Sequence, residues 1–365
     1  MPIIAILSGV ALIAIILRDA FETIILPRTV VRFFSLSRMI NRAVWPRWSR
    51  RTAKSRNDAK RERYLSFYGP VTVIAMLAVW AGALIIGFAM ILYGFGSPLH
   101  SEQHRITFID DIYTSGTTLF TLGLGDMIPT AVIARALLVV EAGTGIGFLT
   151  VVIAYLPVIY QAFSRREAQI TLLDAWAGSP PAATELLRRL AASDAVPELT
   201  RYFHEWERWC GELLEAQISY PQLAYFRSQH GRQSWVSALT TTLDVSALVL
   251  TGLQGVPAWN ARLTFAIARH AAVDLSQVIP APPVDSTRLR QVTNESIIAT
   301  VQQAGFSFTN GTTAAAQLQL YREMYEPFVA GLSVALAMDL PPWLRNPRFK
   351  DNWESTPKRE ADKHI

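Results

Sequence analysis

The chain has 365 residues, of which 51% are hydrophobic and only 17% are charged. Because soluble domains usually carry about 25% charged residues, this composition excludes a wholly soluble protein and predicts that part of the chain lies in a membrane. The single cysteine, Cys210, excludes an intramolecular disulfide framework and a cysteine-based zinc site. The formal net charge is +5, yet residues 27–63 hold twelve Lys and Arg against Asp58 and Glu62, so this segment alone carries +10.

Three apolar segments are long enough to cross a bilayer, which takes about 20 residues. The first lies in residues 1–26, where residues 2–17 carry no charge. A secretory signal peptide begins with basic residues and ends at a small-residue cleavage site. Here the basic residues follow the apolar ones, so we expect an uncleaved helix. The second span is 70–93 and the third is 136–164, interrupted only by Glu141.

The basic segment at 27–63 predicts the orientation of the chain. Short loops rich in Lys and Arg stay on the cytoplasmic side of a membrane, so we expect this segment inside, the N-terminus outside and everything after the third span inside. Aromatic residues interleave with the basic ones, a pattern also found in nucleic-acid binders. The position between two spans favours instead a linker or interfacial helix that contacts anionic lipid headgroups, with no nucleic-acid partner.

Between the second and third spans lies a shorter apolar segment. Residues 112–125 carry no charge but are too few to cross a bilayer, so they predict a re-entrant loop, which is tolerated where irregular backbone lines a water-filled cavity. Thr107, followed three residues later by Asp110, predicts a capping box and a short helix that ends near Phe120. The string after this helix is Thr121-Leu122-Gly123-Leu124-Gly125-Asp126, with Pro129 further on.

This loop, with a span on each side, resembles the pore loop and selectivity filter of the tetrameric potassium-channel superfamily, in the prokaryotic form with a two-helix pore. The resemblance covers about residues 69–163, within a pore domain at 64–163. It implies a homotetramer in the prokaryotic inner membrane that conducts K⁺ passively. K⁺ would be the permeant ion, with no cofactor, and no motif in the sequence supports an enzyme. The resemblance implies these K⁺ ligands: the backbone carbonyls of Thr121, Leu122, Gly123 and Leu124, with the Thr121 hydroxyl forming the innermost site.

The residue types of this filter segment (Thr121–Asp126) suit the implied chemistry. A dehydrated K⁺ needs rings of oxygen atoms, which backbone carbonyls supply, and the backbone angles required are ones that Gly123 and Gly125 adopt at little cost. By resemblance, Asp126 anchors the filter at its outer mouth. Leu122 and Leu124 stand where the family usually has Val or Ile and Tyr or Phe. Because Leu124 cannot hydrogen-bond to the pore helix, a weakly selective cation channel stays an alternative to a K⁺ channel.

The third span is the candidate inner, pore-lining helix. Gly143, Gly145 and Gly147 predict either a gating hinge or close packing against the pore helix. Pro157, near the cytoplasmic end, predicts a kink that shapes the gate. Glu141 is an intramembrane acid, for which a functional role is the default hypothesis. It either faces the cavity and concentrates cations, or hydrogen-bonds behind the pore helix. Its depth favours the second role.

Residues 164–344 predict a helical cytoplasmic domain, because apolar residues recur at spacings of three and four and strand alternation is scarce. The glycine fingerprint of a Rossmann nucleotide site does not occur in it, and the sequence identifies no regulatory ligand. We expect this domain to serve assembly or gate control, and a polar, disordered tail at 345–365. The alternative to a channel is a membrane-bound sensor or signalling protein that uses the pore fold as a scaffold.

The expected fold class is therefore an all-α membrane protein. Three transmembrane helices, a re-entrant pore helix and a filter loop precede the all-α cytoplasmic domain in this prediction. The gate would be the inner helix, with control by the cytoplasmic domain as a further possibility.

Overall fold

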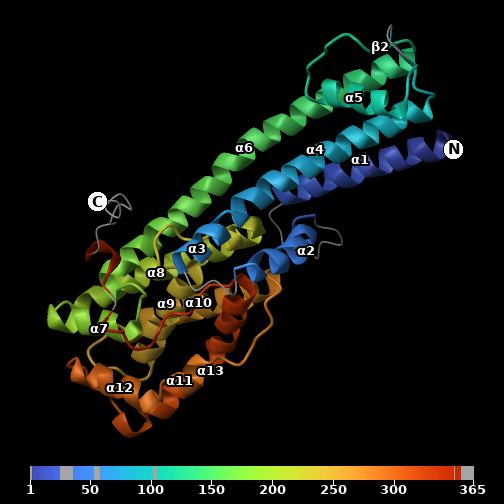
Figure 1. Ribbon diagram of the computed structural model, residues 1–365. Helices are drawn as coiled ribbons and strands as arrows, with labels where there is room; N and C mark the ends of the chain where they lie inside the picture. The colour runs from blue at the N-terminus through green and yellow to red at the C-terminus, as the bar shows by residue number, and fades with distance from the viewer. Residues whose placement is uncertain (1, 25–35, 53–57, 102–104, 349, 355–365) are drawn as a thin grey trace, which may run out of the picture. The chain divides into compact units, whose positions relative to one another are not determined.

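The computed structural model describes residues 2–24, 36–52, 58–101, 105–348 and 350–354. Within these ranges the protein is almost entirely helical (Figure 1). Three helices are long and apolar enough to cross a membrane: α1 (Pro2–Ile24), α4 (Tyr68–Gly94) and α6 (Val132–Ala177). The predicted class, an all-α membrane protein with three long apolar helices and a helical C-terminal part, is confirmed. The chain divides into two compact units, residues 1–48 with 70–161 and residues 49–69 with 162–365.

In the first unit, α1 lies along α4 (Figure 1). Small residues allow the two helices to approach closely, since a Cβ on Gly9 would lie only 2.5 Å from the carbonyl oxygen of Gly87. Near the other end of α1, the indole N–H of Trp80 donates to Asp19 Oδ2 over 2.8 Å, and both side chains are buried. The N-terminal span therefore packs on the outer helix of the pore domain, a partner that its sequence did not reveal.

The basic linker contributes a helix to each unit. Helix α2 (Leu36–Arg50) lies mostly in the first unit and buries Ser37, Asn41 and Trp45, which are four residues apart and share one face. Helix α3 (Asp58–Ser66) belongs to the second unit. Residues 25–35 and 53–57, which complete the predicted linker, lie outside the described part of the chain.

The second unit is built around α9 (Trp235–Leu250), which is buried along almost its whole length. Helix α10 (Ala258–Val278) packs against α9 and α8 (Leu199–Ser219), and α13 (Gly311–Leu336) packs against both α9 and α10. The remaining short helices of this unit are α7 (Ala183–Ala192), η1 (Val196–Glu198), η2 (Pro221–Tyr225), α11 (Arg288–Gln291), α12 (Asn294–Gln303) and η3 (Asn352–Glu354).

Helix α6 continues from the first unit into the second without a break. Hydropathy placed the end of the third span at Ser164, but the helix runs on to Ala177 and stops at Gly178, whose φ of +84° an L side chain rarely adopts. The boundary expected between pore and cytoplasmic domains thus falls inside a helix. Pro157 also lies within this helix.

A short segment, η2 with Phe226, contacts the part of both long helices that belongs to the second unit. The Tyr225 ring lies 5.3 Å from the ring of Tyr68 at the start of α4, and the Phe226 ring lies 5.6 Å from the ring of Phe163 on α6. Arg166 on α6 donates hydrogen bonds of 2.8 Å to the carbonyls of Leu223 and Phe226. The helical unit therefore holds the chain on both sides of the pore domain.

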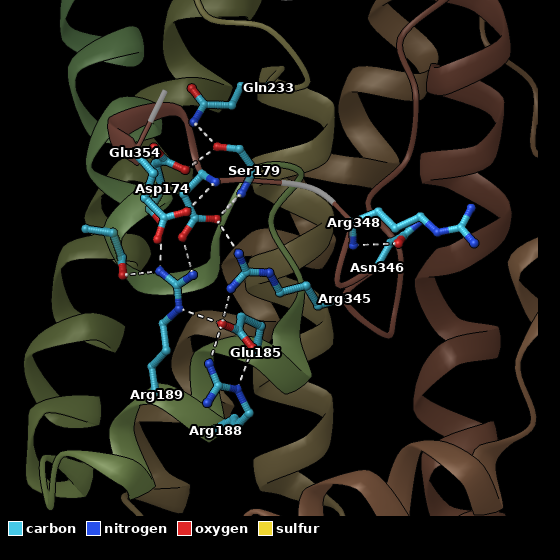
Figure 2. Close-up of polar contacts among 12 residues, drawn as sticks. Asp174, Ser179, Glu185, Arg188, Arg189, Gln233, Arg345, Asn346, Arg348 and Glu354 are labelled. Carbon is cyan, nitrogen blue, oxygen red and sulfur yellow. Dashed lines mark hydrogen bonds and ion pairs between the residues drawn. The ribbon is translucent and has the colours of Figure 1, made fainter. Parts of the chain in front are cut away.

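The C-terminal segment corrects one expectation. Residues from Arg345 onward are polar and predict a disordered tail, yet Arg345 pairs with Glu185 on α7 at 2.5 Å (Figure 2). Asp351 pairs with Arg189 at 2.5 Å and with Arg345 at 3.0 Å. Disorder is therefore wrong for these residues, because ion pairs to α7 hold a segment that has no apolar pattern of its own. Residues 355–365 lie outside the described part of the chain.

Candidate ion-conduction site

The pore helix begins where the sequence predicts it. Helix α5 (Phe108–Leu119) follows the N-cap residue Thr107, whose backbone N–H and hydroxyl donate to Asp110 Oδ2 over 2.7 and 2.8 Å. The capping box is thereby confirmed. The helix ends at Leu119, with Phe120 as its cap, so it stops one residue from the predicted end.

The filter segment that follows has an alternating backbone. Thr121, Gly123 and Gly125 have φ values of +56°, +54° and +79°, whereas Leu122 and Leu124 are not among the residues with positive φ. Left-handed backbone is cheap for glycine but costs a non-glycine residue about 1 to 3 kcal/mol. Alternation between positive and negative φ allows successive carbonyls of one chain to face the same side, as a stack of oxygen rings around an ion requires.

The filter segment is open to its surroundings in the single chain. Every residue from Thr121 to Asp126 is exposed, and the side chains of Leu122 and Leu124 have exposed fractions of 61% and 63%. Both leucines therefore lie at the surface of the single chain. The single chain thus presents the predicted K⁺ ligands on a surface that it does not itself cover.

A tyrosine that the sequence analysis did not identify connects the pore helix to the outer end of the filter segment. The Tyr113 hydroxyl donates a hydrogen bond of 2.9 Å to Asp126 Oδ2. Asp126 therefore contacts the pore helix, in keeping with its implied anchoring role, and Tyr113 supplies a bond that Leu124 cannot make. The sequence carries little signal for this hydrogen bond, because 13 residues separate Tyr113 from Asp126.

The loops before the pore helix and after the filter segment are tied to the same region. Two-residue strands β1 (Leu99–His100) and β2 (Ile128–Pro129) pair in antiparallel fashion on either side of the pore helix and filter in the sequence. Ahead of β1, the Ser97 hydroxyl donates over 2.6 Å to Asp111 Oδ2, and Asp111 is fully buried. These contacts fix both ends of the loop that contains the filter segment.

Glu141 lies behind the pore helix rather than at an open surface. Its side chain is fully buried within one chain and contacts the Ser115 hydroxyl of α5. The same hydroxyl lies 2.9 Å from the carbonyl oxygen of Ile85 on α4. The acid therefore stands where the pore helix, the outer helix and the inner helix meet, which is the position that the second of its two expected roles requires.

The three glycines of the inner helix have different surroundings. A Cβ on Gly145 would lie 1.9 Å from the carbonyl oxygen of Leu119, the last residue of the pore helix, whereas a Cβ on Gly143 or Gly147 would meet nothing within 4 Å in the same chain. Gly145 thus allows α6 to touch the end of α5. This contact supports the close-packing interpretation at one of the three positions.

The helical unit has a cavity but no metal cluster in its described part. The cavity measures about 360 Å³ and is lined by Thr171, Leu172, Asp174, Ala175, His230, Gln233 and Asn352. Among the described residues, no group of three or more His, Cys, Asp or Glu side chains could hold a metal ion. The cavity lining does not identify a class of ligand.

Comparison with known proteins identifies the pore region. Residues 74–161 match a protein family described as "Ion channel". Over 108 residues, the chain is 26% identical to a protein of Bacillus subtilis (strain 168) named "Uncharacterized membrane protein YdjJ". That match covers 29% of this chain and 32% of the relative, so the chain spans about a third of the length of the curated relative. No solved structure shows a significant match.

The chain is therefore a membrane protein that carries an ion channel domain at residues 74–161. The predicted pore resemblance, over about residues 69–163, is confirmed as an ion channel domain. Proteins of this family are typically not enzymes.

Proposed function

We propose that the chain is one subunit of a homotetrameric potassium channel that conducts K⁺ passively. The observation that carries the proposal is the alternating backbone at Thr121, Gly123 and Gly125, directly after a capped pore helix and between two apolar helices. The carbonyls from Thr121 to Leu124 are the proposed K⁺ ligands. They replace the hydration shell of the ion and need no side-chain charge.

Four copies are required because one chain supplies only one side of an axial oxygen ring. The exposed Leu122 and Leu124 and the uncovered filter segment support a neighbouring copy at this surface. Identical chains around one axis form a closed ring, in keeping with the cyclic symmetry of most soluble homo-oligomers. Oligomeric assembly is also general among channels of the matched family.

The hydrogen bond from Tyr113 to Asp126 supports selectivity for K⁺ over weak cation selectivity. It restrains the outer end of the filter segment, where Leu124 has no hydroxyl to offer. The weakly selective alternative keeps one argument of its own, since both filter side chains, Leu122 and Leu124, are aliphatic. A direct comparison of K⁺ and Na⁺ flux separates the two.

The proposed orientation places residues 27–63 and the helical unit inside the cell, with the N-terminus and the outer loops outside, in a prokaryotic inner membrane. Gating would follow movement of α6, which continues into the helical unit without a break. The helical unit also holds residues just before the outer helix. A change in this unit therefore has a direct covalent route to the pore.

The test is ion flux from purified protein in liposomes under K⁺ and Na⁺ gradients. Wild type should pass K⁺ at least about tenfold faster than Na⁺. Gly123→Ala should abolish K⁺ flux, because φ is +54° at this position and a residue with a Cβ is strained there, which displaces the filter carbonyls. Gly82→Ala is the matched control, since its Cβ would meet nothing within 4 Å.

Two outcomes would contradict the proposal. Equal K⁺ and Na⁺ flux would establish the weakly selective cation channel instead. No flux from wild type at any pH or membrane potential would favour the sensor or signalling protein with the pore as scaffold.

A further inference from the structure

The Ser115 hydroxyl contacts two oxygen atoms but carries a single hydrogen. It lies 2.9 Å from the carbonyl oxygen of Ile85 and also contacts Glu141 Oε1. A serine hydroxyl carries one hydrogen, so it can donate to only one of these two oxygens. The carbonyl has no hydrogen to give, and neither has an ionised carboxylate. Both contacts are satisfied together only when the second hydrogen comes from Glu141.

The charge around Glu141 leads to the same conclusion. The side chain is fully buried within one chain, before any neighbouring copy is added, and its contact among the described residues is with the uncharged Ser115 hydroxyl. The sequence has no Lys or Arg in α4 and none from 136 to 164 in α6. The charged residues of the pore helix are both acids, Asp110 and Asp111. A buried carboxylate without a partner is costly, so the neutral acid is strongly favoured.

We infer that Glu141 is a neutral carboxylic acid that donates a hydrogen bond to Ser115, while Ser115 donates to the Ile85 carbonyl, so that one relay joins the inner helix, the pore helix and the outer helix. Glu141 Oε2 accepts no hydrogen bond from the described residues. For a neutral carbonyl oxygen this is a modest loss, whereas for half of an ionised carboxylate it would be severe.

The relay lies in register with the glycine contact of the inner helix. Glu141 meets Ser115, and one turn further along both helices Gly145 meets Leu119. These two contacts form a seam that ends two residues before Thr121. Glu141 is therefore a positioning residue: it sets the place of the pore helix, and through it the start of the filter segment. Its effect on permeation rests on the proposed function.

The protonation state has its own test, independent of ion flux. The infrared difference spectrum between wild-type protein and Glu141→Gln at pH 7 should contain a carboxylic-acid C=O band. Ser115→Ala should shift that band to higher frequency, because the acid loses its hydrogen-bond partner. Glu212→Gln, at an exposed ion pair on α8, should give no such band. A carboxylate band in place of the acid band for Glu141 would overturn the inference.

The positioning role is tested by a pair of variants. Glu141→Gln keeps a donor and an acceptor for Ser115 and should hold the ratio of K⁺ to Na⁺ flux within about twofold of wild type. Glu141→Leu keeps the volume but no polar atom, and this ratio should fall at least about fivefold. Equal ratios in the two variants would overturn the role. If wild type conducts nothing, the proposed function fails while the infrared result still decides the protonation state.

Discussion

Gly145 is the residue at which packing and hinge interpretations of the inner helix can be separated. We predict that Gly145→Ala destabilises the protein by about 2 kcal/mol or more, because the new Cβ would stand 1.9 Å from the Leu119 carbonyl oxygen and overpacking costs about 1 to 3 kcal/mol. Since Leu119 precedes the filter segment by two residues, K⁺ flux should fall as well. Both changes are measured on purified protein, by thermal unfolding and liposome flux.

Gly143→Ala is the control, because its Cβ would meet nothing within 4 Å. Alanine is the better helix former, so this variant should be at least as stable as wild type and conduct normally. A hinge predicts the reverse order, with the loss of flux at Gly143 and little effect on stability at either position. Equal behaviour of the two variants would contradict the packing interpretation of Gly145.

The sequence predicted single residues well wherever a local rule applied. The Thr107–Asp110 capping box needs only residues three apart. The role of Glu141 behind the pore helix stays a prediction, and its burial against Ser115 is in keeping with it. The contact of Tyr113 with Asp126 and that of Ser97 with Asp111 escaped prediction. Each pair lies 13 or 14 residues apart across a turn of the outer loop, a separation at which no periodicity specifies contact.

At the scale of elements, the C-terminal segment and α7 are held together by charge. Glu185 accepts hydrogen bonds from Arg188, Arg189 and Arg345, and only 4% of its side chain is exposed (Figure 2). Burial alone would raise the pKa of Glu185, but the three arginines outweigh it and lower the pKa from 4.5 to about 2. The folded state therefore binds a proton here more weakly than the unfolded state does.

This shift predicts a stability that depends on pH. The contribution of Glu185 is complete above pH 4.5 and is lost as the pH falls from 4.5 towards 2. Glu185→Gln should lower the free energy of unfolding at pH 7 by about 2 kcal/mol, since it removes the buried carboxylate that accepts charged hydrogen bonds from three partly exposed arginines. The variant should also lose less stability than wild type between pH 5 and pH 3. Both are measured by chemical denaturation of the purified protein.

Glu198→Gln provides the comparison, because it removes an exposed ion pair with Arg201 that contributes at most about 1 kcal/mol. It should keep the wild-type pH profile. If Glu185→Gln kept that profile too, the ion-pair network would not hold the C-terminal segment. The composition of this segment hid the network, because polar residues without apolar periodicity are typical of disorder and the partner Glu185 lies 160 residues away.

The boundaries of the long helices were predictable only where a local sequence pattern marks them. The three spans were predictable because each needs only a run of apolar residues. Hydropathy, however, detects the membrane-spanning part of a helix rather than the whole helix. It therefore placed the end of α6 at Ser164, where polar residues begin. The helix itself ends thirteen residues later at Ala177, before Gly178 with its positive φ. The Gly178-Ser179-Pro180-Pro181 stretch itself predicts a helix break, so the sequence holds the signal for this end of the helix although hydropathy does not.

At the scale of the whole molecule, the helical unit is connected to the pore domain twice. The second compact unit includes residues 49–69, ahead of the outer helix, as well as residues 162–365. In it, Arg227 forms a two-pronged ion pair with Glu62 of α3, at 2.6 and 2.7 Å. One compact unit that includes the entry to the outer helix and the exit from the inner helix can transmit a displacement to both, which suits the gate control proposed for it.

The orientation of the whole chain is testable because its only cysteine is inert. Cys210 is fully buried, and burial raises the pKa of its thiol, so the reactive thiolate is scarce. Single cysteines can therefore be introduced into the natural sequence.

In intact cells a membrane-impermeant maleimide should label His100→Cys, which is exposed in the loop before the pore helix. The same reagent should label Arg208→Cys in the helical unit, where the arginine side chain is 82% exposed, only after permeabilisation. The reverse pattern would invert the orientation drawn from the basic linker, and the Asp126 end of the filter segment would then face the cytoplasm. Labelling of the wild-type protein would show instead that Cys210 is accessible.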